Sequence, residues 1–168
     1  GKLFDIRISN MTADNVIDSV HDNLGTSSAY NIKIYGSIFA QSVINSIVNA
    51  EVSDIHVDSS EMKLDGMCLN INNGKFTNGT IANSKIKQNG FAGTIGNAGA
   101  STVTNCTITN AKIGGDGFAH EIKNSSKVEN CSISDAEITG NGFAETIGND
   151  GASTVTNCTI TNAKIGGD

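Results

Sequence analysis

Apolar and polar residues alternate along this chain with a spacing that switches between two and three. In the segment VTNCTITNAKI, residues 103–113, the apolar or small side chains are spaced 3, 2, 3 and 2 residues apart. A spacing of two keeps side chains on one face of a β-strand, and a spacing of three requires an additional residue at a bend. The pattern therefore predicts short strands that turn around a shared interior.

This pattern is repeated. Residues 90–116 recur almost unchanged at 142–168, with a diverged copy between them, so that the tripeptide GFA returns after 27 and then 25 residues. The two differences between the near-identical segments are Gly93 versus Glu145 and Ala98 versus Asp150. An internal period of this length is typical of a solenoid, in which each repeat packs on its neighbours.

In such a stack, equivalent residues of successive coils form interior columns about 4.8 Å apart. One predicted column contains Phe39, Met67, Phe91, Phe118 and Phe143. A second contains Val43, Ile71, Ile95, Ile122 and Ile147. A third contains Cys106, Cys131 and Cys158, with Ala50 and Gly79 in the earlier coils. We expect these columns to form the hydrophobic core.

Asparagine and aspartate mark the bends. The first bend is assigned to Asn49, Asn78, Asn105, Asn130 and Asn157, with Asp5 in the first coil, and the second to Asp54, Asn83, Asn110, Asp135 and Asn162. Stacked amides can hydrogen-bond to one another, so asparagine ladders are predicted. A third corner carries Asp65-Gly66, Asn89-Gly90, Asp116-Gly117 and Asn141-Gly142, dipeptides that tolerate a positive φ.

We therefore predict an all-β fold, a right-handed parallel β-helix (solenoid) of about six to seven coils with 25–27 residues per coil. Residues 1–35 are expected to form degenerate N-terminal coils or a cap, and residues 36–168 the regular repeats. The repeats are expected to continue beyond the chain, because Asp168 stands where the template requires Gly-Phe-Ala next.

Two alternatives concern local and global structure. A short helix over residues 14–25 is an alternative to a degenerate coil, because Val16, Val20 and Leu24 have helical spacing and Gly25 follows. A leucine-rich repeat is the rival fold, since its motif has a similar spacing. Its inward asparagine would fall on Ala111, Ala136 and Ala163, where alanine cannot supply the hydrogen bonds.

The charge of the chain argues against anionic partners. It has 168 residues, with 11 Lys and Arg against 17 Asp and Glu, a formal net charge of −6, and Arg7 is its only arginine. Nucleic acid and anionic membrane are therefore poor partners. We also expect no membrane insertion, because no apolar segment reaches the ~18 residues that a span needs.

Metal and cofactor sites are not expected. The cysteine column reads as a packing position, and Cys68, at the position of Ala92 and Ala119, as a further small interior residue. All four cysteines are therefore predicted to be free thiols. The sequence GGDG at 114–117 is similar to a calcium-binding repeat, but Ala119 replaces the later aspartate and the period is too long.

Catalytic residues are not expected either. Outward carboxylates such as Glu51, Glu129 and Glu137 are scattered, and the alternating column Lys112, Glu137 and Lys164 needs only a solvation role. The three histidines share no column, and His120-Glu121 lacks the second histidine of a zinc-protease motif. Pairs of outward-facing threonines in successive coils suggest ice binding as an alternative function, but Ala82 interrupts this threonine array.

The sequence GFAxxIGN followed by STVTNCTITNAKIGG resembles the GLUG-motif and related β-solenoid repeats of bacterial surface and secreted proteins, over residues 36–168. The resemblance implies a parallel β-solenoid that serves as a stalk, passenger or adhesive region. It carries no catalytic residues.

We therefore predict a non-catalytic structural or adhesive segment of a larger surface or secreted protein, with a protein or carbohydrate ligand and edge-to-edge self-association. A scaffold or targeting domain of a secreted effector is the first alternative, and free thiols would suit the bacterial or host cytosol. A polysaccharide-active β-helix enzyme is the second.

Overall fold

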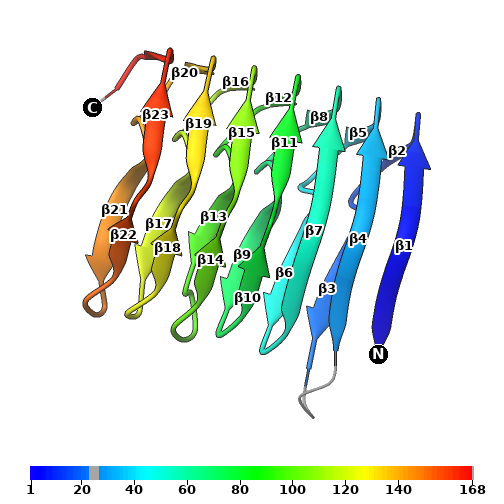
Figure 1. Ribbon diagram of the computed structural model, residues 1–168, viewed down its shortest axis with the longest axis horizontal. Coiled ribbons are helices and arrows are strands. Elements are labelled where there is room, and N and C mark those ends of the chain that lie inside the picture. Colours follow the sequence, from blue (N-terminus) through cyan, green and yellow to red (C-terminus); the bar gives the residue numbers. More distant parts are fainter. Residues whose placement is uncertain (23–26, 168) are drawn as a thin grey trace.

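The computed structural model describes residues 1–22 and 27–167. These residues form three parallel β-sheets with 11, 7 and 6 strands, and successive turns of the chain add one layer to each sheet. The result is a parallel β-solenoid of about six turns, as predicted. In Figure 1 the turns lie side by side from β1 at one end to β21, β22 and β23 at the other.

The 11-stranded sheet has long strands in the first coils and pairs of short strands in the later ones. Its strands are β1 (Lys2–Ser9), β4 (Ser28–Tyr35), β7 (Glu51–Asp58), β10 (Lys75–Thr77), β11 (Thr80–Ala82), β14 (Thr102–Thr104), β15 (Thr107–Thr109), β18 (Lys127–Glu129), β19 (Ser132–Ser134), β22 (Thr154–Thr156) and β23 (Thr159–Thr161).

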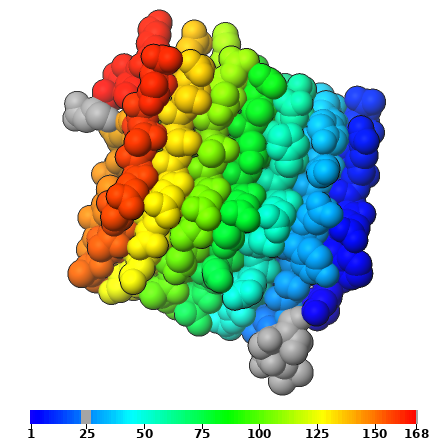
Figure 2. Space-filling model, in the orientation of Figure 1, coloured from blue at the N-terminus to red at the C-terminus, as the bar shows by residue number. Residues whose placement is uncertain are grey.

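The other two sheets complete each coil. The 7-stranded sheet contains β2 (Thr12–Ala13), β5 (Ile38–Phe39), β8 (Glu61–Met62), β12 (Lys85–Ile86), β16 (Lys112–Ile113), β20 (Glu137–Ile138) and β24 (Lys164–Ile165). The 6-stranded sheet contains β3 (Ile17–His21), β6 (Ile44–Val48), β9 (Cys68–Asn72), β13 (Ala92–Ile95), β17 (Ala119–Lys123) and β21 (Ala144–Asn149). Figure 2 shows the coils as adjacent bands of colour, each beside its neighbours in sequence.

The predicted asparagine ladders are present. The first-bend column is Asp5, Asn31, Asp54, Asn78, Asn105, Asn130 and Asn157, with φ between 53° and 58°. The Nδ2 of Asn78 donates to the Oδ1 of Asp54 at 3.0 Å, and Asn157 donates to Asn130 at 3.3 Å. Asparagine and aspartate tolerate this left-handed backbone conformation, which explains their selection at the bends.

The second-bend column follows five residues later in each coil. Its members are Asn10, Gly36, Ser59, Asn83, Asn110, Asp135 and Asn162, with φ between 50° and 56°. The Nδ2 of Asn110 donates to the Oδ1 of Asn83 at 2.8 Å. Both bends therefore combine a left-handed residue with a side-chain ladder.

The predicted register of the coil before residue 60 is wrong by one bend. Asp54 belongs to the first bend, and Asn49 lies in a further column, where it accepts a 2.9 Å bond from Asn73. Two readings satisfy the 3-2-3-2 spacing, because residues 47–57 and residues 52–62 fit it equally. Pairing of Val52 with Phe76 selects the second reading.

The same shift corrects the interior columns. Phe39 pairs with Met62 in the 7-stranded sheet, outside the phenylalanine column. Ile47, which pairs with Ile71, takes the place assigned to Val43. In the cysteine column, Ile55 replaces Ala50, because its neighbour His56 pairs with Thr80.

The remaining column assignments are confirmed. Phe91 stacks on Phe118 and Phe118 on Phe143, with ring centroids 4.8 Å apart in both pairs. Ile71, Ile95, Ile122 and Ile147 pair in register, and Cys68 aligns with Ala92 and Ala119. Apart from Phe143 and Ile147 in the final coil, these side chains are buried. Stacked rings and branched side chains thus form one continuous core.

The helix considered for residues 14–25 is absent from its described part. Ile17–His21 is strand β3, in which Ile17 pairs with Ile44 and Val20 with Ile47. The neighbouring coil satisfies backbone donors that a short isolated helix would leave exposed, so pairing is preferred. Leu24 and Gly25 lie outside the described residues.

The corner glycines serve a different purpose from the one predicted. Gly66, Gly90 and Gly117 do not have a positive φ. Instead, a Cβ atom built on each of them would collide with the carbonyl oxygen of the equivalent glycine in the next coil. Glycine is therefore required by the close approach of stacked backbones.

Candidate functional site

The cysteine column is an interior packing feature. All four cysteines are free thiols, as predicted. Cys106 and Cys131 are buried, and each thiol lies 3.3 Å from the carbonyl oxygen two residues before it. Burial raises the pKa of the Cys68 and Cys106 thiols well above the usual value, which keeps them protonated and unreactive at neutral pH.

A polar groove of about 670 Å³ follows the second bend along the stack. Its floor includes a serine ladder, in which the Ser37 amide donates to Ser60 at 3.1 Å and the Ser60 amide to Ser84 at 3.2 Å. Its rim carries the charged column Glu61, Lys85, Lys112 and Glu137. The serine hydroxyls are buried and donate to carbonyl oxygens of their own coils, and Ala111 takes the place of Ser84 in the next coil. The groups open to a ligand are therefore the second-bend side chains and the charged column.

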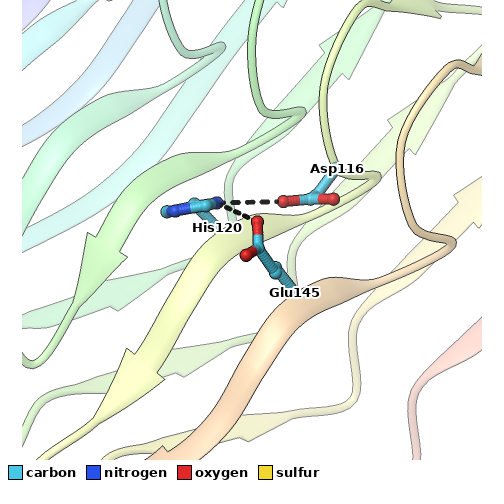
Figure 3. Close-up of side chains that lie close together, drawn as sticks. All are labelled: Asp116, His120 and Glu145. Atoms are coloured by element: carbon cyan, nitrogen blue, oxygen red, sulfur yellow. Dashed lines mark hydrogen bonds and ion pairs between the residues drawn. The ribbon is translucent and has the colours of Figure 1, made fainter. Parts of the chain in front are cut away.

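A second candidate is a cluster of Asp116, His120 and Glu145, shown in Figure 3. The Nδ1 of His120 lies 3.3 Å from the Oδ2 of Asp116 and 3.1 Å from the Oε2 of Glu145. The three ligand-type atoms lie within 4.8 Å of one another. We call these three residues the carboxylate–histidine cluster.

The stack brings the cluster together from two coils. Asp116 stands at the corner before β17, which carries His120, and Glu145 lies in β21. Ala119 pairs with Ala144, so the residues that follow them, His120 and Glu145, are adjacent on the outer face of the sheet.

Asp116 is held in place by the corner column. Its Oδ1 accepts the amide of Asn141 at 2.9 Å, and its own amide donates to Asn89 at 3.0 Å. Its Oδ2 remains directed at His120. The Asp116 side chain is 8 % exposed, against 48 % for His120 and 57 % for Glu145, so a buried carboxylate anchors two accessible partners.

Sequence reasoning assigned Asp116 only to the third corner and gave His120 and Glu145 no functional role. It compared the histidines with one another and the carboxylates within columns, whereas the cluster joins three different columns. A usable signal was present, because Glu145 is one of two positions at which residues 142–168 differ from residues 90–116. The i, i+4 spacing of Asp116 and His120 carried no such signal, because Asp116 lies at the corner before β17 and strand periodicity does not extend across that corner.

Asp65 heads the same corner column two coils earlier. Its side chain is buried, and its Oδ1 accepts both the amide and the Nδ2 of Asn89, at 3.2 and 2.8 Å. Its Oδ2 has no hydrogen-bond partner among the described residues. Burial raises the pKa of Asp65 from 3.8 to about 6.

Sequence comparisons with known proteins give no relative from which a function could be assigned, so the assignment of a function rests on the local features described above. Neither a protein-family model nor a curated protein sequence matches the chain. Over residues 1–22 and 27–167, the structure contains no helix with the length and hydropathy that a membrane crossing requires.

Proposed function

We propose that this chain is a non-catalytic structural or adhesive segment of a longer bacterial surface or secreted protein. Its partner would be an extended ligand, such as a polysaccharide, that lies along the polar groove. The surface location rests on the resemblance of the repeat to GLUG-motif solenoids.

The groove is the observation that carries this proposal. It crosses several coils, from Ser37 to Glu137, and the second-bend side chains Asn83, Asn110 and Asp135 line it at the strand spacing of about 4.8 Å. A ligand with repeating hydroxyl groups can make equivalent hydrogen bonds to successive coils. Many weak, regularly spaced contacts then add up to useful avidity, as in other multivalent binding.

The carboxylate–histidine cluster favours a non-catalytic role over glycoside hydrolysis. Glycosidases use two carboxylates that flank the scissile bond at about 5–10 Å from each other. Here the Asp116 and Glu145 oxygens lie within 4.8 Å of each other, and both face one imidazole nitrogen. The His120 nitrogen therefore occupies the position beside both carboxylates that a glycosidic bond would need.

Binding to a glycan and surface-protein array tests the adhesive role. The groove variant Lys85→Gln/Lys112→Gln should lose about 10-fold in affinity for the ligands that wild-type protein binds. A matched control, Lys33→Gln/Lys127→Gln, removes the same charge from the 11-stranded sheet and should bind like wild type. Equal loss in both variants, or turnover of a polysaccharide in the same panel, would contradict the proposal.

A further inference from the structure

We propose that Asp116, His120 and Glu145 form a binding site for a divalent transition-metal ion of the Zn²⁺ type. The site would join the coil that contains β17 to the coil that contains β21. It lies on the 6-stranded sheet, apart from the polar groove.

The distances fit a shared metal ion. A tetrahedral ion with bonds of 2.0–2.2 Å holds its ligand atoms about 3.3–3.6 Å apart. The two N–O distances at His120 are 3.1 and 3.3 Å. The Asp116 and Glu145 oxygens lie within 4.8 Å of each other, so one ion bound to all three ligand atoms would hold them at about the tetrahedral spacing.

Hydrogen bonding alone satisfies this arrangement poorly. A ring nitrogen carries at most one proton, yet the Nδ1 of His120 faces a carboxylate oxygen on each of two coils. One proton would have to be shared between two acceptors. A metal ion on neutral His120 instead accepts a lone pair from the nitrogen and from both oxygens.

The local charge also suits a dication. Among the described residues, the ion pairs of Asp116 and Glu145 are made with His120, whereas the neighbouring Glu121 is paired with Lys123 at 3.0 Å. Two carboxylates beside a neutral imidazole carry a charge of about −2, which one divalent ion neutralises. The Asp116 carboxylate is largely buried, so its part of this charge is poorly screened by water, whereas Glu145 is accessible to solvent.

The ligand set selects among divalent ions. Imidazole nitrogen favours Zn²⁺, Co²⁺, Ni²⁺ or Cu²⁺, whereas Ca²⁺ prefers six or more oxygen ligands. Three protein ligands leave at least one coordination position for water. The chemistry therefore points to a borderline transition metal and away from Ca²⁺.

The internal repeat supplies a built-in control. One coil earlier, the positions equivalent to Asp116, His120 and Glu145 are occupied by Asn89, Gly93 and His120. That coil therefore lacks this set of ligands. The substitution Glu145→Gly restores the residue found in the near-identical segment 90–116. It removes one ligand without introducing a residue foreign to the repeat.

Calorimetric titration of metal-free protein with Zn²⁺, Co²⁺ and Ca²⁺ tests the site. Wild-type protein should bind one Zn²⁺ or one Co²⁺ and bind Ca²⁺ at least 10-fold more weakly. A 100-fold excess of Zn²⁺ over its Kd should raise the Tm by roughly 5–10 °C. Glu145→Gly and His120→Gln should each lower the Zn²⁺ affinity at least 10-fold, and Glu121→Gln should leave it unchanged.

The spectrum of bound Co²⁺ separates this site from the thiols. Nitrogen and oxygen ligation gives weak visible bands, whereas thiolate ligation adds an intense charge-transfer band in the near ultraviolet. We expect the former. The proposal is overturned if Co²⁺ shows the thiolate band, if Glu145→Gly and His120→Gln bind Zn²⁺ like wild type, or if no ion binds below 1 mM, a threshold of about −4 kcal/mol.

Discussion

At the residue scale, stability depends on side chains that fit a left-handed bend or a buried corner. The first-bend residues combine a φ near 55° with ladder hydrogen bonds between exposed amides. In the corner column, by contrast, Asp65 is buried, and its Oδ2 has no hydrogen-bond partner among the residues that the structure describes. These two environments lead to different predictions.

The substitution Asn130→Ala should lower the free energy of unfolding by about 1–2 kcal/mol. Alanine disfavours the φ of 55° and removes the acceptor for Asn157. The variant Asn130→Gly loses the same hydrogen bond and keeps the backbone freedom, so it should lose less. Urea unfolding of both variants measures the two contributions, and equal losses would mean that backbone conformation is not the main cause.

Asp65 should make stability fall as the pH rises. Because burial raises its pKa from 3.8 to about 6, the folded state prefers the protonated form. Its contribution is fully present below about pH 4 and is lost as the pH rises through about 6. The variant Asp65→Asn should therefore be more stable than wild type above pH 7, by at most about 3 kcal/mol.

The measurement is the unfolding free energy of both proteins between pH 4 and 8 in the presence of a chelator. The difference between Asp65→Asn and wild type should grow mainly between pH 4 and 6. Asparagine already occupies this column at Asn89 and Asn141, so the fold should accept it. A constant difference across this range would show that Asp65 is not buried as a charged group.

At the scale of the single coil, the close approach of stacked backbones limits which residues the corner accepts, more than the backbone dihedral angles of the corner do. The strands of the 6-stranded sheet begin after these corners, and the carbonyl of each corner glycine faces the glycine of the preceding coil. A wider corner would separate the coils and weaken the pairing of β13, β17 and β21. The cluster geometry, which spans β17 and β21, depends on the same spacing.

The substitution Gly117→Ala should cost about 3 kcal/mol, because its Cβ meets the backbone carbonyl of Gly142, which cannot move alone. Gly79→Ala provides the matched comparison. Its Cβ would meet the Phe76 and Phe91 rings, at 2.7 and 3.1 Å, and these can adjust, so a loss of about 1 kcal/mol is expected. Thermal unfolding would contradict this reasoning if Gly79→Ala were the more damaging change.

At the scale of the whole molecule, the coils differ in how many neighbours cover them. Ile95 is fully buried, whereas its equivalent Ile147 is 48 % exposed. In the described residues, β21 pairs with β17 alone, while β13 pairs with both β9 and β17. Nearly the same sequence thus occupies a central and a terminal position of one stack.

Hydrogen exchange of this chain should find residues 142–167 less protected than their counterparts at 90–115. Because local sequence is almost constant, the difference reports the free energy that a second neighbouring coil contributes. Protection in the terminal segment should increase with protein concentration if its edge associates with another copy. Equal protection in a dilute monomer would show that coils are stable without a second neighbour.

The sequence by itself determined the class of fold, the strand periods and most interior columns, because spacings of two and three leave few other arrangements of apolar side chains. It could not set the register before residue 60, since the 3-2 pattern repeats itself after five residues. Only pairing with the next coil, as between Val52 and Phe76, resolved that ambiguity. The meeting of Asp116, His120 and Glu145 was likewise decided by stacking, because contacts between coils depend on register and corner geometry that no single repeat contains.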